Sequence, residues 1–347
     1  MAYLSEKAAR LTPYLAGLQP QETGWVKLNT NENPYPPSPK VAEVLAEADL
    51  SRLRLYPNSG SDALCHTLAY YWGVSAKQVF AGNGSDEVLA FSFGAFFDGK
   101  QGVMMPDISY GFYPVWAKLF GLCVDICPLR DDFTIDPANY QGAAGVVIAN
   151  PNAPTGIVLT LAEVEQIVQQ NPQCVVLVDE AYLDFSTVES AITLTAQYDN
   201  LLVVRTFSKS HSLAGLRVGY AVGHEALIDG LQRMKHSFNS YPLDMLAQLS
   251  AAASMADAAY WEETRSRIIA TRERTVMELE ALGYHVLPSQ ANFLFVQAAD
   301  AKGLYEHLLD HKVLVRYWSK PGISDYLRIT IGTEKEMEVF LKCVKQF

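Results

Sequence analysis

The chain has 347 residues, of which 49% are hydrophobic and 19% are charged. Because a domain typically takes about 100–200 residues, this length predicts two domains, and the apolar content excludes a disordered chain. The formal net charge of −11 at pH 7 disfavours nucleic acid as a partner, since an acidic surface repels phosphate backbones.

The cysteines and apolar runs indicate the compartment. The five cysteines, at positions 65, 123, 127, 174 and 343, show neither CxxC spacing nor a disulfide framework. The N-terminus has no pattern of a secretory signal, and no stretch reaches the roughly 18 apolar residues of a membrane span. We therefore expect a soluble cytoplasmic protein that contacts no membrane and binds no metal.

The first two-thirds of the chain predicts alternating strands and helices. Residues 1–30 are expected to form a short helix and an extended arm, followed by a proline-rich loop over 29–39. Strands are predicted at 79–80, 101–106, 145–150, 174–180 and 200–208, with helices after the glycine turn at 82–84 and over 160–170. Continuous β-branched runs are typical of parallel strands buried on both faces. This order predicts an α/β domain with a doubly wound, mostly parallel sheet.

The pattern changes after about residue 245. An Ala-rich, charged segment over 246–283 predicts one long connecting helix. Strands expected at 292–297, 313–318 and 326–332, with a helix at 301–310, predict a smaller α+β domain. We therefore expect an N-terminal arm (1–30) that joins the small domain, a large domain (31–245) and a small C-terminal domain (246–347).

Chemically useful side chains follow three of the predicted strands. Asn150, Asp179 and Lys209 each come at or just after the end of an apolar run. Ligands bind beyond the carboxyl ends of strands in open α/β sheets. We expect an amide, a carboxylate and an amine to converge at one sheet edge.

Lys209 and Asp179 each allow two interpretations, one structural and one functional. Lys209 is either a solvated surface lysine or a partly desolvated amine near a second cation, Arg217, and in that case suited to forming a Schiff base. Asp179 is either a cap for a loop or helix, or a buried anion that pairs with a cation such as a protonated ring nitrogen.

Other candidates come from local motifs. The segment GNGSDE (82–87) is either an ordinary capped helix start or a phosphate site at a helix N-terminus. It lacks the third glycine of GxGxxG and the lysine of a P-loop, which disfavours a nucleotide. Tyr110 is either a core residue or a platform for a planar ring. Arg328, within an apolar strand candidate, requires an anion if it is buried, and Arg316 precedes it.

Together, seven segments resemble the fold-type I pyridoxal-phosphate aminotransferases, and most closely the histidinol-phosphate aminotransferase family. The matching segments are NTNENPYPPSP (29–39), RLYP (54–57), GNGSDE (82–87), NPNAPTG (150–156), VDEAYLDF (178–185), RTFSKSHSLAGLRVGY (205–220) and YLRITIGT (326–333). They occur in the family's order and span nearly the whole chain. The segment around the lysine, with its downstream arginine, is the most specific of them.

The resemblance implies a role for each matching residue. Lys209 is expected to form the Schiff base (aldimine) with the cofactor and then to move a proton, while Asp179 binds the ring nitrogen and Tyr110 stacks on the ring. The remaining cofactor contacts implied are Ser85, Asp86, Ser208 and Arg217 at the phosphate, Asn152 and Tyr182 at the ring oxygen, and Tyr56 reaching the phosphate from a neighbouring subunit.

The resemblance also implies substrate contacts and a reaction. Arg328 is expected to bind the anionic end of the substrate, and Arg316 to support its phosphate. Tyr14 closes the pocket from the N-terminal arm, and Asn33 is a further substrate contact. The implied enzyme is a homodimer with shared active sites. It transfers an amino group between L-histidinol phosphate plus 2-oxoglutarate and imidazole acetol phosphate plus L-glutamate, in histidine biosynthesis.

The motifs leave rival functions open. An aromatic amino acid aminotransferase and an L-threonine-O-3-phosphate decarboxylase share these motifs. A ligand-binding protein without activity is disfavoured by the intact Lys209, Asp179 and Arg217. One position departs from the family pattern, because Ala153 replaces the second asparagine of NPNNPTG. Since Asn152 is taken as the ring-contacting position, we expect little loss.

Overall fold

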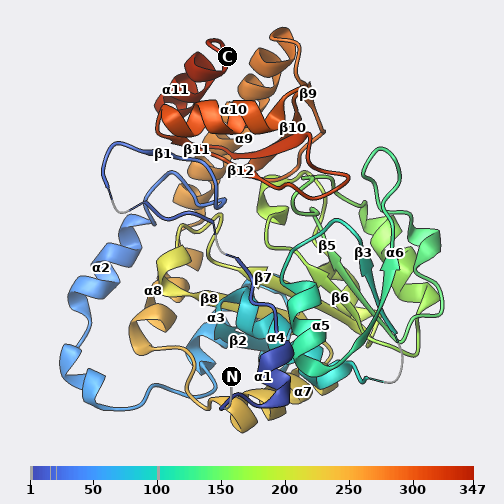
Figure 1. Ribbon diagram of the computed structural model, residues 1–347. Helices are drawn as coiled ribbons and strands as arrows, with labels where there is room; N and C mark the ends of the chain where they lie inside the picture. The colour runs from blue at the N-terminus through green and yellow to red at the C-terminus, as the bar shows by residue number, and fades with distance from the viewer. Residues whose placement is uncertain (1–2, 16, 21, 100–101) are drawn as a thin grey trace.

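The computed structural model describes residues 3–15, 17–20, 22–99 and 102–347. Within these residues the chain forms a seven-stranded sheet, a four-stranded sheet and a two-stranded pair. Figure 1 shows the large sheet and its helices in the lower part of the molecule and the small sheet, with the last three helices, at the top. The predicted α/β class, with a second and smaller sheet, is confirmed.

The large sheet is mostly parallel, as predicted. Its order is β2 (Val79–Asn83), β8 (Val218–Gly223), β7 (Leu201–Thr206), β6 (Val176–Asp179), β5 (Gly145–Ala149), β3 (Gly102–Pro106) and β4 (Cys123–Cys127). Strand β8 runs antiparallel to both neighbours, and the other neighbouring pairs are parallel. Strands β4 and β8 were not predicted, because β4 is a largely exposed edge and β8 contains two glycines.

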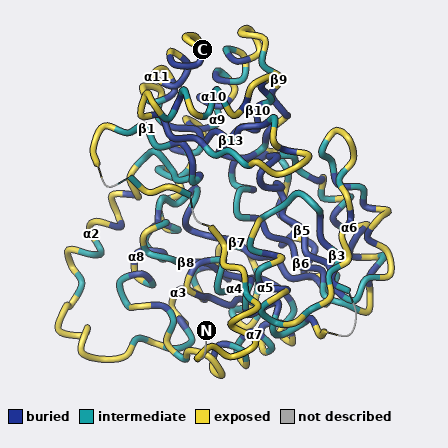
Figure 2. The backbone as a smooth tube through the Cα atoms, viewed as in Figure 1, coloured by how far each residue is buried: buried dark blue, intermediate teal, exposed yellow. Residues whose placement is uncertain are grey.

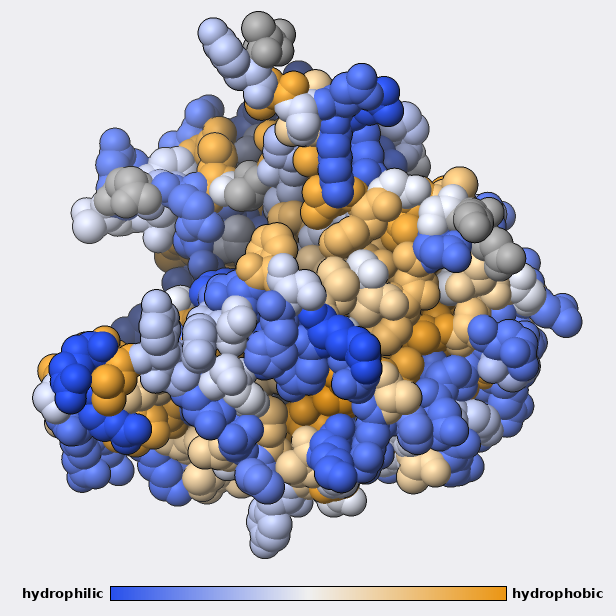
Figure 3. Space-filling model, turned by 90° about the horizontal axis from the view of Figure 1, so that it is seen from below, coloured by the Kyte–Doolittle hydropathy of each residue, from blue (hydrophilic) through white to orange (hydrophobic). Residues whose placement is uncertain are grey.

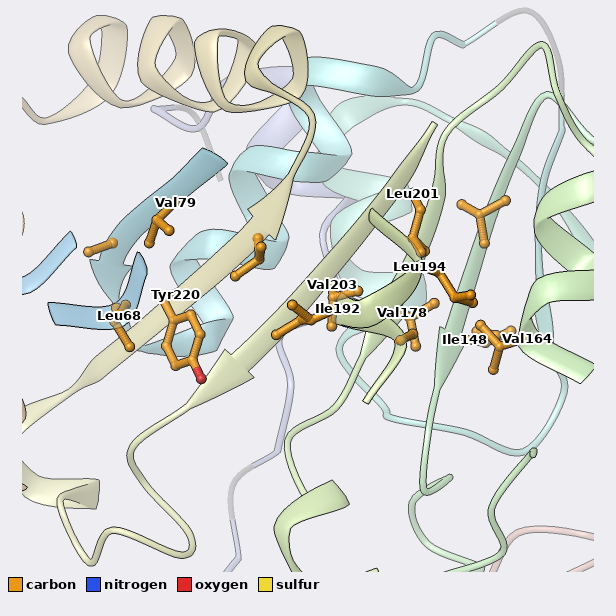
Figure 4. Close-up of a cluster of buried hydrophobic side chains, with 14 of the residues drawn as sticks. Leu68, Val79, Ile148, Val164, Val178, Ile192, Leu194, Leu201, Val203 and Tyr220 are labelled. Atoms are coloured by element: carbon orange, nitrogen blue, oxygen red, sulfur yellow. The ribbon is translucent and has the colours of Figure 1, made fainter. Parts of the chain in front are cut away.

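Helices cover both faces of the large sheet. One face packs against α4 (Gly84–Phe96), α5 (Tyr113–Phe120) and α7 (Glu225–Phe238). The other packs against α3 (Asp62–Trp72), α6 (Leu161–Gln170) and α8 (Met245–Met255), with α2 (Pro39–Glu47) beside α8. Successive strand residues point to opposite faces, so Val176 and Val178 join the second layer while Leu177 joins the first. Figure 2 shows the sheet as the buried centre, and Figure 4 shows Ile148, Val178 and Val203 packed together in the second layer.

The small sheet is antiparallel, and the N-terminal segment joins its side of the molecule. Its order is β12 (Arg316–Tyr317), β13 (Tyr326–Thr330), β10 (Phe293–Gln297) and β9 (His285–Val286), with a core shared with α9 (Ala258–Ala281), α10 (Ala301–Asp310) and α11 (Glu334–Val344). After the short helix α1 (Glu6–Arg10), β1 (Val26–Lys27) pairs in parallel with β11 (Val313–Leu314). The single strand predicted over 313–318 is therefore two strands that belong to different sheets.

The single helix predicted over 246–283 is also wrong, because the chain breaks into α8 and α9 at Ala256 and Asp257. The two helices pack into different cores: Ala247 and Ala251 of α8 lie in the core of the large sheet, and Ile268 of α9 lies in that of the small sheet. The domain boundary predicted at residue 245 stays a prediction. We propose that the division lies at the break between α8 and α9.

No helix in the described part of the chain is both long enough and apolar enough to cross a bilayer.

We predict that Leu202→Ala lowers the free energy of unfolding by about 3 kcal/mol, because it leaves a cavity in the middle of a close-packed sheet. The Leu202 side chain is fully buried in the central strand β7. The measurement is chemical denaturation of the purified protein. The matched control is Leu249→Ala, at a side chain that is 37% exposed, where we expect a loss of about 0.5 kcal/mol. Equal losses would contradict this description of the core.

Candidate active site

A cavity of about 300 Å³ lies where the large and small sheets meet. Asp179 and Thr206, at the carboxyl ends of β6 and β7, line it from the large sheet. Arg316 of β12 and Arg328 of β13 line it from the small sheet, and Tyr14 lines it from the N-terminal arm. This is where open α/β sheets bind ligands.

Lys209 projects its amine into this cavity from the loop that follows β7. Its Nζ lies 3.4 Å from the carbonyl oxygen of Thr30 and 5.4 Å from the centre of the Tyr182 ring. The amide of Asn33 donates to the carbonyl of Lys209 (3.0 Å) and to that of Ser210 (3.1 Å). The backbone that carries the amine is therefore fixed.

Asp179 is a buried carboxylate at the floor of the cavity. Its Oδ2 accepts a hydrogen bond from the Tyr113 hydroxyl (2.8 Å), and its Oδ1 accepts from the Ala181 N–H (3.2 Å). Burial raises the pKa of Asp179 to about 6, and these two hydrogen bonds offset only part of that effect. A cation brought against Asp179 would relieve the desolvation cost, so the site favours a positively charged group there.

The N-terminus of α4 and Arg217 form a cradle for an anion. Ser85 and Asp86 lie in the first turn of α4 and line the cavity. Arg217 Nη1 donates to the Ser208 hydroxyl (3.4 Å), and Nη2 donates to Asp86 Oδ2 (3.0 Å). Gly84 has a φ of 77°, and a Cβ there would lie 2.6 Å from Arg217 Nη2. Helix N-H groups and a guanidinium together suit a phosphate.

The aromatic rings of Tyr14, Tyr110 and Tyr182 line the cavity. The Tyr110 hydroxyl donates to Asp86 Oδ1 (2.8 Å), which fixes the ring. Tyr14 stacks on Phe112 with 4.3 Å between ring centres. The Tyr182 hydroxyl accepts from Asn31 Nδ2 (3.0 Å). These rings offer flat apolar surfaces to a planar ligand.

Arg316 and Arg328 face the cavity without a carboxylate partner among the described residues. Arg328 Nη2 donates to the carbonyl of Asn29 (2.8 Å), but its Nε is buried and has no hydrogen-bond partner. Burial lowers the pKa of Arg328, and the nearby Arg316 lowers it further. A buried guanidinium that lacks a counter-charge calls for an anionic ligand.

Three predicted site residues do not line the cavity of this single chain. The Asn152 amide donates to the carbonyl of Ile108 (2.9 Å) and its oxygen accepts from Ser109 (2.7 Å), while its neighbour Ala153 lines the cavity. The expected contact of Asn152 with a ring oxygen stays a prediction. Asn33 holds the lysine loop through its amide, and its predicted substrate contact stays a prediction.

Tyr56 is the third of these residues. Its side chain is 81% exposed and stacks on Tyr241 at 4.7 Å. An exposed aromatic residue outside the cavity is compatible with a contact to another subunit, so its predicted role stays a prediction.

Some residues around the cavity were missed from the sequence. Tyr113 supports Asp179 from α5, and only the three-dimensional packing brings them together. Asn31 adopts a left-handed φ of 56°, a conformation that asparagine tolerates, and its place in a turn-rich motif was an available signal. Glu32 lines the cavity as well. Burial raises the pKa of Glu32, but hydrogen bonds from Lys27 and Thr30 outweigh burial and lower it overall.

Known proteins resemble this chain over its full length. A protein from Bordetella parapertussis named histidinol-phosphate aminotransferase 1 is 51% identical, over 99% of this chain and 98% of its own. A histidinol-phosphate aminotransferase from Clostridium botulinum is 48% identical over the same shares. Among solved structures, histidinol-phosphate aminotransferase from Sinorhizobium meliloti in complex with pyridoxal-5'-phosphate has the same fold, with a TM-score of 0.85 and 22% identity over 92% of this chain and 91% of that one.

The family model described as aminotransferase class I and II matches residues 23–344. That span includes both sheets and every cavity-lining segment except the arm that carries Tyr14 and Gly17. The chain therefore belongs to the class I and II aminotransferases, the pyridoxal-phosphate-dependent family that its motifs predict.

Proposed function

We propose that this aminotransferase interconverts L-histidinol phosphate plus 2-oxoglutarate and imidazole acetol phosphate plus L-glutamate, a step of histidine biosynthesis. The observation that carries the proposal is the pair Arg316 and Arg328, which face the Lys209 cavity with no carboxylate partner in the described part of the chain. A phosphorylated amino donor supplies a negative charge for them. The names of relatives that are 48% and 51% identical support this substrate.

The residues present fit pyridoxal phosphate. Asp179 offers a buried anion for the ring nitrogen, Arg217 and the start of α4 offer a phosphate cradle, and Lys209 offers the amine. When bound, the cofactor supplies an electron-accepting ring. Asp179 would keep a proton on the ring nitrogen, and Lys209 Nζ would take a proton from the substrate α-carbon and deliver it to an atom two bonds away.

The aromatic rings favour a second candidate, an aromatic amino acid aminotransferase. Tyr14 and Tyr110 line the cavity and pack against Phe112, and this wall suits an imidazole or a phenyl ring alike. The arginines distinguish the two candidates by the anion that they bind, because histidinol phosphate carries a phosphate on the arm of its α-carbon where an aromatic amino acid carries a carboxylate.

A homodimer is supported by the exposed apolar side chains around Tyr56. These include Leu50, Leu53, Leu55, Phe238 and Tyr241. Figure 3 shows hydrophobic residues reaching the surface on the face seen from below. Exposed apolar patches mark interaction sites. All five cysteines are free thiols. This supports a location in the cytoplasm, where the reducing environment keeps thiols from forming disulfides.

The deciding experiment is a half-reaction followed by absorbance, with L-histidinol phosphate, L-phenylalanine or L-threonine phosphate as the only amine. Fast loss of the absorbance of the lysine–cofactor linkage with histidinol phosphate alone supports the proposal. An equal response to phenylalanine would assign a broad aromatic aminotransferase. Carbon dioxide release from threonine phosphate would assign a decarboxylase.

We predict that Lys209→Ala abolishes turnover and the absorbance of the lysine–cofactor linkage, because no other amine of the described chain lines the cavity. The phosphate cradle still retains the cofactor. Absorbance spectra of the reconstituted variant test this, with the exposed Lys302→Ala as the control. If the Lys209→Ala variant kept the linkage absorbance, Lys209 could not be the residue that is linked to the cofactor.

Arg328→Ala is expected to raise KM for histidinol phosphate by on the order of 30- to 1,000-fold, since losing a buried charge-assisted contact costs about 2–4 kcal/mol. Cofactor affinity changes little, because Arg328 lies on the small-sheet side of the cavity. Steady-state kinetics and a cofactor titration measure both. An unchanged KM for histidinol phosphate would contradict the anion-binding role of Arg328.

The substitution Asp179→Asn tests how much the buried carboxylate lowers the free energy of unfolding. The folded-state pKa of Asp179, about 6, lies above its ordinary value, so folding favours the protonated form and wild-type stability falls as pH rises from about 4 to 6. In the cofactor-free protein we expect the variant to gain about 2–3 kcal/mol over wild type between pH 4 and pH 7. Denaturant titrations at both pH values measure this gain, and a pH-independent difference would contradict it. Cofactor affinity falls in the same variant.

A further inference from the structure

A buried ion-pair network lies behind the cavity. Arg205, in β7, is 5% exposed. Its Nη1 donates to Glu180 Oε2 at 2.7 Å, and its Nη2 donates to Asp184 Oδ1. The other oxygen of Asp184 accepts from the hydroxyl of Ser210. One guanidinium thus joins two carboxylates, one of which holds the residue next to Lys209.

Strand geometry places this network on the face of the sheet opposite the cavity. Glu180 directly follows Asp179, and successive side chains of an extended chain point to opposite sides. The Arg205 guanidinium lies 5.0 Å from the Trp72 ring of α3, on the face that also packs Leu201 and Val203. None of the described network residues is among those that line the cavity of Asp179 and Lys209.

The network links the two functional strand ends. Glu180 follows Asp179 at the end of β6, and Ser210 follows Lys209 beyond β7. Through Arg205 and Asp184, the backbone that carries the carboxylate is tied to the backbone that carries the amine. On the cavity side, Asn33 holds the carbonyls of Lys209 and Ser210. The peptide that follows Lys209 is thus held by side chains from two directions.

Every member of the network has partners. Glu180 also accepts from the Ser190 hydroxyl (2.5 Å) and the Ala191 N–H (2.7 Å). Arg265 donates to the backbone carbonyl of Asp184, which adds a second positive charge. A buried polar network that is fully satisfied rigidifies its members and specifies one geometry.

We propose that Asp184 is a positioning residue for the reaction: held by Arg205, it fixes Ser210 and so aims the Lys209 amine at the atoms between which the proton moves. This inference rests on the proposed function, because it assumes that Lys209 is the proton-transferring amine. A small misplacement of such a group costs up to about 100-fold in rate.

The test compares two single-hydroxyl deletions in the reconstituted full-length enzyme. Ser210→Ala removes the link to Asp184, while Ser190→Ala removes a bond to the other carboxylate, Glu180, on the side away from Lys209. Both serines are buried, with exposures of 2% and 8%. The measurements are the single-turnover rate with histidinol phosphate, its KM, the deuterium isotope effect at the α-carbon, and the pH titration of the lysine–cofactor absorbance without substrate.

We expect Ser210→Ala to slow the single turnover at least about 10-fold with KM nearly unchanged, to increase the isotope effect and to shift the absorbance titration. Ser190→Ala stays within about twofold in every measurement, and Ser210→Thr, which restores the hydroxyl, recovers most of the rate. If Ser210→Ala does not fold, Asp184→Asn is measured in the same way, with the same expected direction.

Equal effects of the two deletions, or no effect of Ser210→Ala, would overturn the positioning role. The Lys209→Ala spectrum separates this failure from that of the proposed function. If Lys209→Ala loses the linkage absorbance while Ser210→Ala behaves as wild type, the function stands and only the positioning role is wrong.

Discussion

The active site depends on one buried carboxylate. Asp179 lies at the end of a fully buried strand, where the pKa of its side chain is raised by burial. The described residues supply a hydroxyl from Tyr113 and a backbone N–H, but no counter-ion. Part of the cost of folding this site is therefore left for a cationic ligand to offset, so ligand binding and stability are coupled.

The same strand end organises both faces of the sheet. Asp179 points to the cavity, and its neighbour Glu180 points to the opposite face, where it pairs with Arg205. One charge is left unpaired for the ligand, and the other is fully paired within the chain. This division follows from the two-residue period of a strand. As a result, one backbone segment carries both the carboxylate that faces the cavity and the carboxylate that belongs to the supporting ion-pair network.

Much of the fold and the site could be predicted because their signals are local. The apolar runs that form β5, β6 and β7 are long and β-branched, and the residues that end them, with Lys209 just beyond β7, lie where parallel strands present ligands. Strand β8 could not be found in this way, because its two glycines weaken the signal and its place is set by pairing with β2 and β7. The break between α8 and α9 has no proline and follows from packing into two separate cores.

The motif that contains Asn152 and Ala153 also shows what cannot be predicted from local sequence signals. The motif gives both residues, but the side chain that faces the cavity is decided by the turn, which directs the Asn152 amide to Ile108. Tyr113 was missed for a related reason, since 66 residues separate it from Asp179. Residues that act through distant contacts leave no trace in spacing or periodicity.

The N-terminal arm is attached at both ends of the cavity. Thr12 accepts a hydrogen bond from Lys118 of α5, and Tyr14 stacks beside that helix, whereas β1 pairs with β11 on the small-sheet side. The arm therefore works as a tether of fixed contour length between the two sides. An opening that separates the small sheet from α5 by more than this segment can span must break one of these attachments, and the weaker attachment then limits how wide the site opens to incoming molecules.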